Sequence, residues 1–255
     1  MWGLKTKLMV LQALLLLALG SPAQKSKKES PILNNITISF ENKVGGQLLD
    51  MDSVYQNAFG EAFTVTQFKY YISNISFNDA AGKEAKIPDT YFLINQQDSA
   101  GKSITISTPL SVITGINFLI GIDSIKNVSG VQTGVLDPLN GMFWTWSTGY
   151  IMAKLEAVSP VSKAPQSRVT YHIGGFTAPY NAVKKISLPL GSLLQLHPAN
   201  ISRISISADI NKWFSGASDI RIADHNFCMN PGSLSNAIAA NYAAMFSIQS
   251  ISLSK

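Results

Sequence analysis

The chain has 255 residues, of which 46% are hydrophobic and 14% charged, so it is long enough to bury the core of one large domain. Its formal net charge is +5, which falls by two, to +3, when Lys5 and Lys7 of an N-terminal leader are left out. Residues 25–29 of the expected tether carry a further net +2, so the folded part is nearly neutral and gives no basis for nucleic-acid binding. The single cysteine, Cys228, excludes an intrachain disulfide, and we expect it to be a small buried hydrophobe.

The first residues have the layout of a secretory signal. Lys5 and Lys7 precede the apolar residues 8–19, and the small residues Ser21 and Ala23 frame a cleavage site. We expect a signal peptide over residues 1–23, a flexible tether over residues 24–31 and a single β-sandwich domain over residues 32–255. No later segment is long and apolar enough to form a transmembrane span. The mature protein is therefore expected to be exported, to the periplasm or to the outside of the cell.

Short runs of alternating hydrophobic and polar residues, separated by turns, predict β-strands through most of the chain. Only residues 233–246 have helical spacing, with Ser233 or Ser235 as the expected N-cap. The weakly periodic residues 122–140 are expected to form a lid or wall of any site beside them. The pattern predicts an all-β fold, mainly an antiparallel, immunoglobulin-like β-sandwich, with one C-terminal α-helix. The expected strands cover residues 36–40, 63–77, 91–95, 103–107, 116–121, 141–158, 169–173, 183–190, 201–210 and 246–253.

Residues 141–150 contain two of the four tryptophans, two positions apart. In an extended strand Met142, Trp144 and Trp146 share one face, a pattern that by itself is typical of a core strand. The expected strand 168–175 carries His172 at its polar parity. Imidazole, indole and thioether groups that converge suit copper better than magnesium or calcium.

Three further patterns surround these strands. Lys154 and Glu156 share one parity of the strand that continues the tryptophan segment, which predicts a wet face there. Trp213 is expected to anchor the core. His225 lies in the run Asp224-His225-Asn226-Phe227-Cys228-Met229, which is rich in donor atoms but matches no standard zinc or haem spacing.

Motifs of several enzyme classes are absent from the sequence. It has no Gly-x-Ser-x-Gly elbow, no His-Glu-x-x-His pair, no phosphate-binding glycine-rich loop and no Cys-x-x-Cys pair. Its three histidines do not lie beside a serine and an acid in the sequence. We therefore expect a binding protein and not an enzyme.

Two segments, Met142-Phe143-Trp144-Thr145-Trp146 and Tyr171-His172-Ile173-Gly174-Gly175, resemble the paired signatures of the MbnP-like copper-binding domain. Proteins of this family are exported and are associated with methanobactin and with bacterial copper handling. Residues 70–75, 121–123 and 241–246 fit as well, so the resemblance extends from about residue 36 to residue 253. It implies copper(I) held by two histidines and a tryptophan that a haem-containing partner enzyme oxidises to kynurenine. One histidine maps onto His172, and the modified tryptophan onto Trp144 or Trp146.

The sequence departs from the family pattern at one ligand. Many members carry an Asn-His pair where this chain has Asn127-Val128, and valine cannot bind a metal. A second donor then comes from His225 or His197, or is a sulfur of Met142, Met229 or Cys228. Two functions stay open: capture or handling of Cu(I), and metal-free binding of a protein or glycan through Trp144, Trp146 and Trp213. The candidate metal-site residues are His172, Trp144, Trp146, His225 and Met142.

Overall fold

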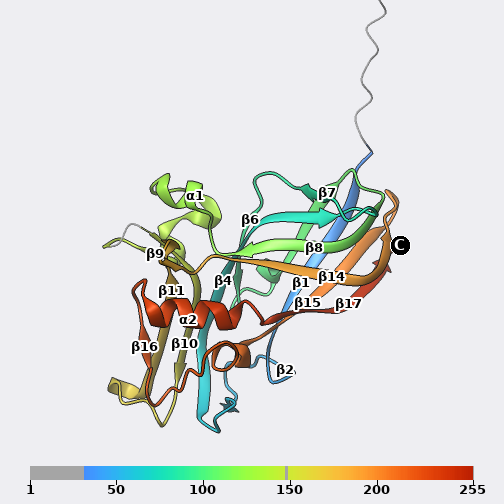
Figure 1. Cartoon of the computed structure of the whole chain (residues 1–255). Coiled ribbons are helices and arrows are strands. Elements are labelled where there is room, and N and C mark those ends of the chain that lie inside the picture. Colours follow the sequence, from blue (N-terminus) through green and yellow to red (C-terminus); the bar gives the residue numbers. More distant parts are fainter. Residues whose placement is uncertain (1–31, 147–148, 255) are drawn as a thin grey trace, which may run out of the picture. The chain divides into compact units, whose positions relative to one another are not determined.

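Two β-sheets and a two-stranded ribbon make up most of the part of the chain that the structure describes (Figure 1). The structure is a computed structural model that describes residues 32–146 and 149–254. The expected signal peptide and tether, residues 1–31, lie outside this part. The strand-dominated architecture confirms the all-β fold class. Among the described residues, no helix has the length and apolar character that crossing a membrane requires.

The smaller sheet has five strands, in the order β17-β15-β1-β2, with β7 also paired to β1. Alternation along β1 places Ile36, Ile38 and Phe40 on the buried face. β1 and β15 run parallel, while the other pairs of this sheet are antiparallel. Its strands are β1 (Asn34–Val44), β2 (Gln47–Leu48), β7 (Ser103–Thr108), β15 (Ile201–Asp209) and β17 (Phe246–Ser254).

The larger sheet has ten strands, with the path β14-β8-β4-β10-β11-β16. β3, β5 and β6 pair with β4, and β9 pairs with β10. Its strands are β3 (Tyr55–Gln56), β4 (Ala62–Asn78), β5 (Glu84–Lys86), β6 (Tyr91–Asn95), β8 (Val112–Ile120), β9 (Phe143–Trp144), β10 (Gly149–Val158), β11 (Arg168–Gly174), β14 (Lys184–Gln195) and β16 (Phe227–Cys228). The separate ribbon consists of β12 (Phe176–Thr177) and β13 (Tyr180–Asn181).

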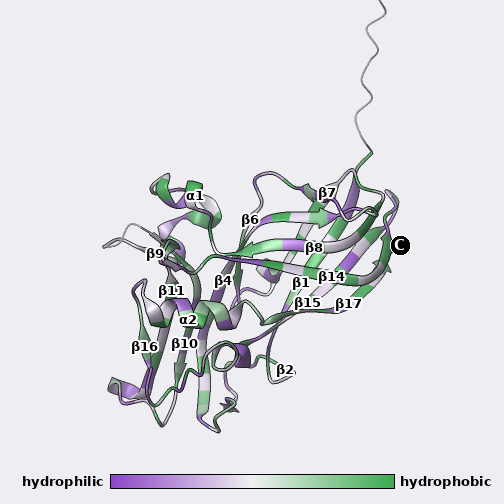
Figure 2. Ribbon diagram, viewed as in Figure 1, coloured by the Kyte–Doolittle hydropathy of each residue, from purple (hydrophilic) through white to green (hydrophobic). Residues whose placement is uncertain are grey.

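Aromatic side chains join the two sheets in a common core. The Phe40 ring of β1 lies 6.0 Å from that of Phe118 on β8 and 6.3 Å from that of Phe246 on β17, both in edge contact. Each such buried ring contributes about 1.5–3 kcal/mol relative to an exposed one. Figure 2 shows hydrophobic residues alternating with polar ones along these strands, as a half-buried sheet requires.

A helical layer covers the inner face of β10 and β11. It consists of η5 (Ile210–Trp213) and α2 (Ser233–Tyr242), and the Trp213 ring lies 5.2 Å from that of Tyr242. The expected C-terminal helix is therefore present, but it ends at Tyr242, because Phe246 already pairs with Ala208 in the smaller sheet. The predicted serine cap is wrong: the N-cap is Gly232, and Ser235 donates instead to the Gly174 carbonyl, at 3.0 Å.

A lid formed by residues 122–146 covers part of the outer face of the larger sheet. It contains the short helices α1 (Ser124–Val128), η2 (Gly134–Leu136) and η3 (Pro138–Asn140), followed by β9. Tyr71 of β4 donates to the Val135 carbonyl at 3.1 Å, and Tyr150 of β10 donates to the Leu136 carbonyl at 2.8 Å. The weakly periodic segment thus acts as the expected wall over the tryptophan hairpin.

Candidate metal centre

His172 lies on β11, on the outer face of the larger sheet. Its neighbours Val169, Tyr171 and Ile173 point inward and are buried, as the alternation predicts. His172 itself is only 8% exposed, although it lies on the strand face that alternation predicts to be polar. It pairs across the strands with Lys154, and its Nε2 lies 2.7 Å from Oε1 of Glu156, two residues further along β10.

The contact with Glu156 assigns the protonation of the imidazole. A carboxylate only accepts hydrogen bonds, so the Nε2 of His172 carries the hydrogen that it donates. This hydrogen bond is also the main reason why the pKa of Glu156 lies below its usual value. Nδ1 then holds the free lone pair, and it is buried without a hydrogen-bond partner among the described residues. A histidine whose second nitrogen is held by a carboxylate is the usual arrangement of a metal ligand.

Trp144, on β9, packs against Gly174, which lies two residues along β11 from His172. An added Cβ at Gly174 would be 2.4 Å from Cζ3 of Trp144, so the indole occupies the space that this glycine leaves. His172 and Gly174 share one parity of β11, which places the indole and the imidazole on one side of the sheet. The Nε1 of Trp144 is likewise buried without a partner in the described chain.

Trp146 does not share a strand face with Trp144, so that prediction is wrong. Trp144 pairs with Gly149, which closes a hairpin between β9 and β10, and Trp146 lies in its turn. The two rings still meet, with centroids 6.0 Å apart and planes tilted by 33°. Trp144 is 1% exposed and Trp146 62%, so one indole belongs to the interior and the other to the surface.

The prediction of a wet face around Lys154 is also wrong. Lys154 is buried because the end of the lid lies over it, and its Nζ donates to the Gly141 carbonyl at 2.5 Å. Lys69, its neighbour on β4, donates to the Asn140 carbonyl at 3.1 Å. Burial lowers the pKa of Lys154. The two lysines thus hold the start of the tryptophan hairpin against the sheet.

The chain is similar to known proteins in both sequence and fold. The family model described as MbnP matches residues 33–230 of the chain. The chain belongs to the MbnP family. Among solved structures, MbnP from Methylosinus trichosporium is similar, with 16% sequence identity, a TM-score of 0.50, and coverage of 74% of this chain and 80% of that one. No curated protein matches the chain.

Membership of the MbnP family, as the sequence resemblance indicated, associates the chain with copper and methanobactin. At 16% identity, the likeness to the Methylosinus trichosporium structure shows a shared fold and nothing about ligands. The residues of this chain therefore have to be considered one by one. The described residues contain no group of three or more His, Cys, Asp or Glu side chains that could hold a metal ion.

The position of the missing family histidine lies beside the tryptophan hairpin. Asn127, near the end of α1, is buried, and its Oδ1 accepts from the backbone N–H of Tyr150 at 3.1 Å. Its amide group also donates to the Ile122 carbonyl at 2.6 Å. Val128 follows and is 71% exposed. The structure thus presents an exposed aliphatic side chain at the position where the resemblance puts a ligand.

The structure does not bring the other two histidines to His172. β16 runs parallel to β11 and pairs Phe227 with Thr170, so His225 lies four residues below the level of His172, roughly 13 Å along the strand. Its side chain is exposed. His197 follows β14, whose Gln195 pairs with Val112 at the far end of β8, on the order of 25 Å or more from the tryptophan hairpin.

The candidate sulfur ligands differ in their placement. Met142 is fully buried, and its backbone carbonyl accepts from the Ile151 N–H at 2.9 Å. Cys228 is a buried free thiol on the inner side of β16, as expected, and burial raises its pKa to about 11. Met229 is half-buried and comes directly after β16.

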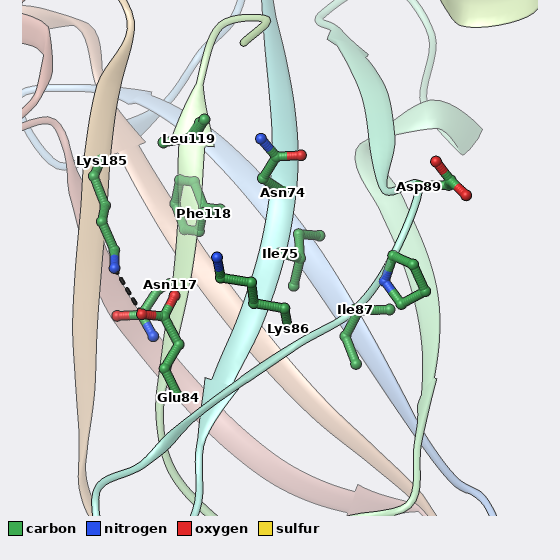
Figure 3. Close-up of a pocket in the computed structure, with 11 residues that line it drawn as sticks. Asn74, Ile75, Glu84, Lys86, Ile87, Asp89, Asn117, Phe118, Leu119 and Lys185 are labelled. Atoms are coloured by element: carbon green, nitrogen blue, oxygen red, sulfur yellow. Dashed lines mark hydrogen bonds and ion pairs between the residues drawn. The ribbon is translucent and has the colours of Figure 1, made fainter. Parts of the chain in front are cut away.

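A depression of about 540 Å³ lies elsewhere on the larger sheet, along β4, β5 and β8 (Figure 3). Glu84, at its rim, is 2.8 Å from the Nζ of Lys185 and accepts from the Ser76 hydroxyl at 2.6 Å. The amide of Asn117 donates to Asn78 at 2.9 Å. Since these polar groups already pair with one another, this hollow is a weaker candidate for a metal site than the surroundings of His172.

Sequence reasoning identified His172 and Trp144 but missed the residues that position them. Alternation placed Glu156 and Lys154 on a polar strand face without a contact to His172, and Gly174 was noted only as part of a family signature. Diagonal pairing of Glu156 with His172 follows from the β10–β11 register, which spacing along the chain does not specify. The alternation of Lys154, Glu156 and His172 was the available signal, because all three fall on one face once their strands pair.

Proposed function

We propose that this chain is an exported copper-binding protein that captures or handles Cu(I) outside the cytoplasm, with Nδ1 of His172 as its central ligand. The observation that supports this most directly is the free Nδ1: it is buried, has no described partner, and its ring is oriented through Nε2 by Glu156. A buried acceptor without a partner costs about 1–3 kcal/mol, which a bound cation removes. Export rests on the leader sequence in residues 1–23.

Copper(I) fits this environment better than a harder ion. Imidazole nitrogen and thioether sulfur are ligands that soft or borderline metals prefer, whereas magnesium and calcium take oxygen ligands. The buried indole of Trp144 over Gly174, two residues from His172 on β11, adds an apolar surface that favours an ion of low charge. The family association with copper points the same way.

The accessible tryptophan is Trp146. In this proposal a haem-containing partner enzyme uses dioxygen to open the indole ring, and hydrolysis then releases formate and leaves kynurenine. The product carries an aromatic amine and a ketone, which offer lone pairs that the indole N–H lacks. An enzyme that acts on the folded chain reaches Trp146, which is 62% exposed, and not Trp144, which is 1% exposed.

The chain itself acts by binding and not by catalysis in this proposal. The competing function, metal-free binding of a protein or glycan through an aromatic face, required Trp144, Trp146 and Trp213 at the surface. Trp144 and Trp213 are buried, so Trp146 is the one of the three that is exposed. The aromatic face as drawn from the sequence is therefore not formed, and copper binding is the better-supported function.

Anaerobic titration of the mature protein with Cu(I), in competition with a chromophoric chelator, tests the proposal. The parent is expected to bind one Cu(I), and His172→Ala is expected to weaken binding by at least about a hundredfold. His197→Ala is the matched control, because His197 is exposed and distant, and its affinity should equal that of the parent. His225→Ala should also leave binding unchanged.

Intact mass of protein from the native host, measured alongside, reports whether a tryptophan has been oxidised. A parent that binds no Cu(I) either before or after such oxidation overturns the proposed function. Equal affinities of the parent and His172→Ala would show that copper binds elsewhere on the chain.

A further inference from the structure

His172 supplies one nitrogen, and the position where the family resemblance puts a second histidine holds Val128. From the arrangement of β16 beside β11, we infer that the sulfur of Met229 is the second protein ligand of the copper site. This inference rests on the proposed function. It changes the site from a two-histidine centre to one with a nitrogen and a thioether ligand.

The strand register places Met229 beside His172. β16 pairs in parallel with β11, with Thr170 opposite Phe227 and Tyr171 opposite Cys228. His172 is the next residue of β11 and Met229 is the first residue after β16, so continuing this register by one residue makes them neighbours. Alternation gives them the same face, since Cys228 is buried on the inner side while Phe227, on the outer side, is 56% exposed.

A surface hollow independently places Met229 on the outer face. This depression of about 450 Å³ is lined by Glu156, Thr170, Phe227 and Met229, together with residues at the ends of β10 and β11. Glu156 is the residue that holds Nε2 of His172 at 2.7 Å. Met229 and the carboxylate that orients the imidazole thus line one hollow on the outer face.

The spacing between neighbouring strands fits one shared ion. Adjacent strands lie about 4.8 Å apart, and metal ions sit about 2.0–2.1 Å from imidazole nitrogen and about 2.3 Å from sulfur. A nitrogen and a sulfur on adjacent strands can therefore reach the same ion without movement of the backbone. The three rotatable bonds of methionine allow its sulfur to adjust to the position that His172 sets.

The three buried methionines of the described chain are less suited to this role. The sulfur of Met152 accepts from the Ile122 N–H at 3.2 Å, and that of Met245 accepts from the Trp213 indole at 3.3 Å. Met142 is fully buried. Met229 is the half-buried methionine whose side lies toward the hollow.

A nitrogen and thioether pair makes the site selective for oxidation state. Thioether sulfur is a soft neutral ligand, so the site should favour Cu(I) over Cu(II) and over Zn(II). Oxidation of Met229 to its sulfoxide replaces this soft donor with a polar group. Peroxide treatment should therefore lower the affinity for Cu(I).

X-ray absorption of the Cu(I)-loaded full mature chain tests the inference without any variant. The parent is expected to show one sulfur scatterer at about 2.3 Å together with nitrogen scatterers. In Met229→Leu, which has nearly the same volume, the sulfur signal should disappear and the affinity for Cu(I) should fall at least about tenfold. Met51→Leu, a half-buried methionine in the loop before β3, is the matched control and should retain both.

The outcomes separate this inference from the proposed function. If His172→Ala loses Cu(I) while Met229→Leu keeps the parent's affinity and spectrum, the role of Met229 is overturned and the proposed function stands. If the parent binds no Cu(I), both are overturned. Met229→His covers the case in which the leucine variant does not fold: it should bind Cu(I) with a spectrum that contains nitrogen and no sulfur. A sulfur signal that persists in Met229→His would refute the assignment.

Discussion

The hydrogen bond between His172 and Glu156 predicts how copper affinity responds to a residue that does not touch the metal. Glu156→Ala removes the acceptor that holds the imidazole ring and sets its tautomer. Nδ1 would then lose part of its orientation and basicity. The affinity for Cu(I) should fall, while the folded structure should persist, because the carboxylate lies at the partly exposed side of the contact.

The size of the effect follows from the geometry. A hydrogen bond to a charged group contributes about 1.5–3 kcal/mol, and loss of such a support for a metal ligand costs about 10- to 100-fold in affinity. The Glu156 side chain is 35% exposed, so water replaces part of the contact and the lower end of the range applies. We expect about a tenfold loss for Glu156→Ala. Glu156→Gln keeps a neutral acceptor oxygen and should lose only about threefold.

Competition titrations with Cu(I) at neutral pH measure these changes, and the chain offers a closely matched control. Glu84 also forms a charged contact, 2.8 Å from Lys185, and its side chain is 34% exposed, but it lies on β5, away from His172 (Figure 3). Glu84→Ala should leave copper affinity unchanged. In a His172→Ala background, Glu156→Ala should have no further effect, because the two residues act through one contact.

Two results would refute this reasoning. One is a Glu156→Ala protein that binds Cu(I) within about twofold of the parent, a difference too small for a lost charged hydrogen bond. The other is an equal loss for Glu156→Ala in the presence and absence of His172. Either would mean that the carboxylate does not act through the imidazole.

Two further predictions concern packing and pH. Gly174→Ala drives a Cβ to 2.4 Å from the Trp144 ring, so it should lower the free energy of unfolding by about 1–3 kcal/mol and weaken Cu(I) binding. Gly232→Ala is the control, because its Cβ meets no atom within 4 Å and its stability should change little. Equal urea midpoints for the two variants would contradict the packing. Burial raises the pKa of Glu61, but hydrogen bonds from Asn57, Ala223 and Ile222 outweigh burial, so the folded-state pKa lies below its usual value. The stability that the Glu61 carboxylate contributes should therefore be present above the unfolded-state pKa of about 4.3 and be lost as pH falls through the folded-state pKa. Urea midpoints measured from pH 7 to pH 3 should show this loss of stability. Glu61→Gln should be less stable than the parent at pH 7, and its stability should depend less on pH. A parent whose stability does not change below pH 4 would contradict this role of Glu61.

The sequence by itself determined the elements whose patterning is local. Alternation along β11 placed His172 on the face that Val169, Tyr171 and Ile173 do not share. This holds because successive side chains of a strand point to opposite faces, whatever the strand packs against. Helical spacing of apolar residues located α2, because this period is also a local property of the chain. The two signature segments indicate the family by themselves, and the family model confirms it.

Other features depended on which segments meet in three dimensions. The periodicity of residues 141–150 is compatible with one long strand, and the pairing of Trp144 with Gly149 turned it into a hairpin that exposes Trp146. Lys154 has the pattern of a solvent-facing residue, yet the lid buries it through its contact with Gly141. A local pattern records which face of a strand is polar, but whether a distant segment covers that face depends on loop paths and on the whole core.

The candidate site depends most strongly on tertiary structure. Glu156 meets His172 through the antiparallel register of β10 and β11. The proposed ligand Met229 is placed beside His172 by extending the parallel register of β16, which is separated from β11 by more than fifty residues of chain. Neither register follows from spacing, because a shift by one residue would turn every side chain of a strand to the other face. Residue types alone indicated that the chain holds soft ligands; which of these side chains come together depends on how the sheet pairs.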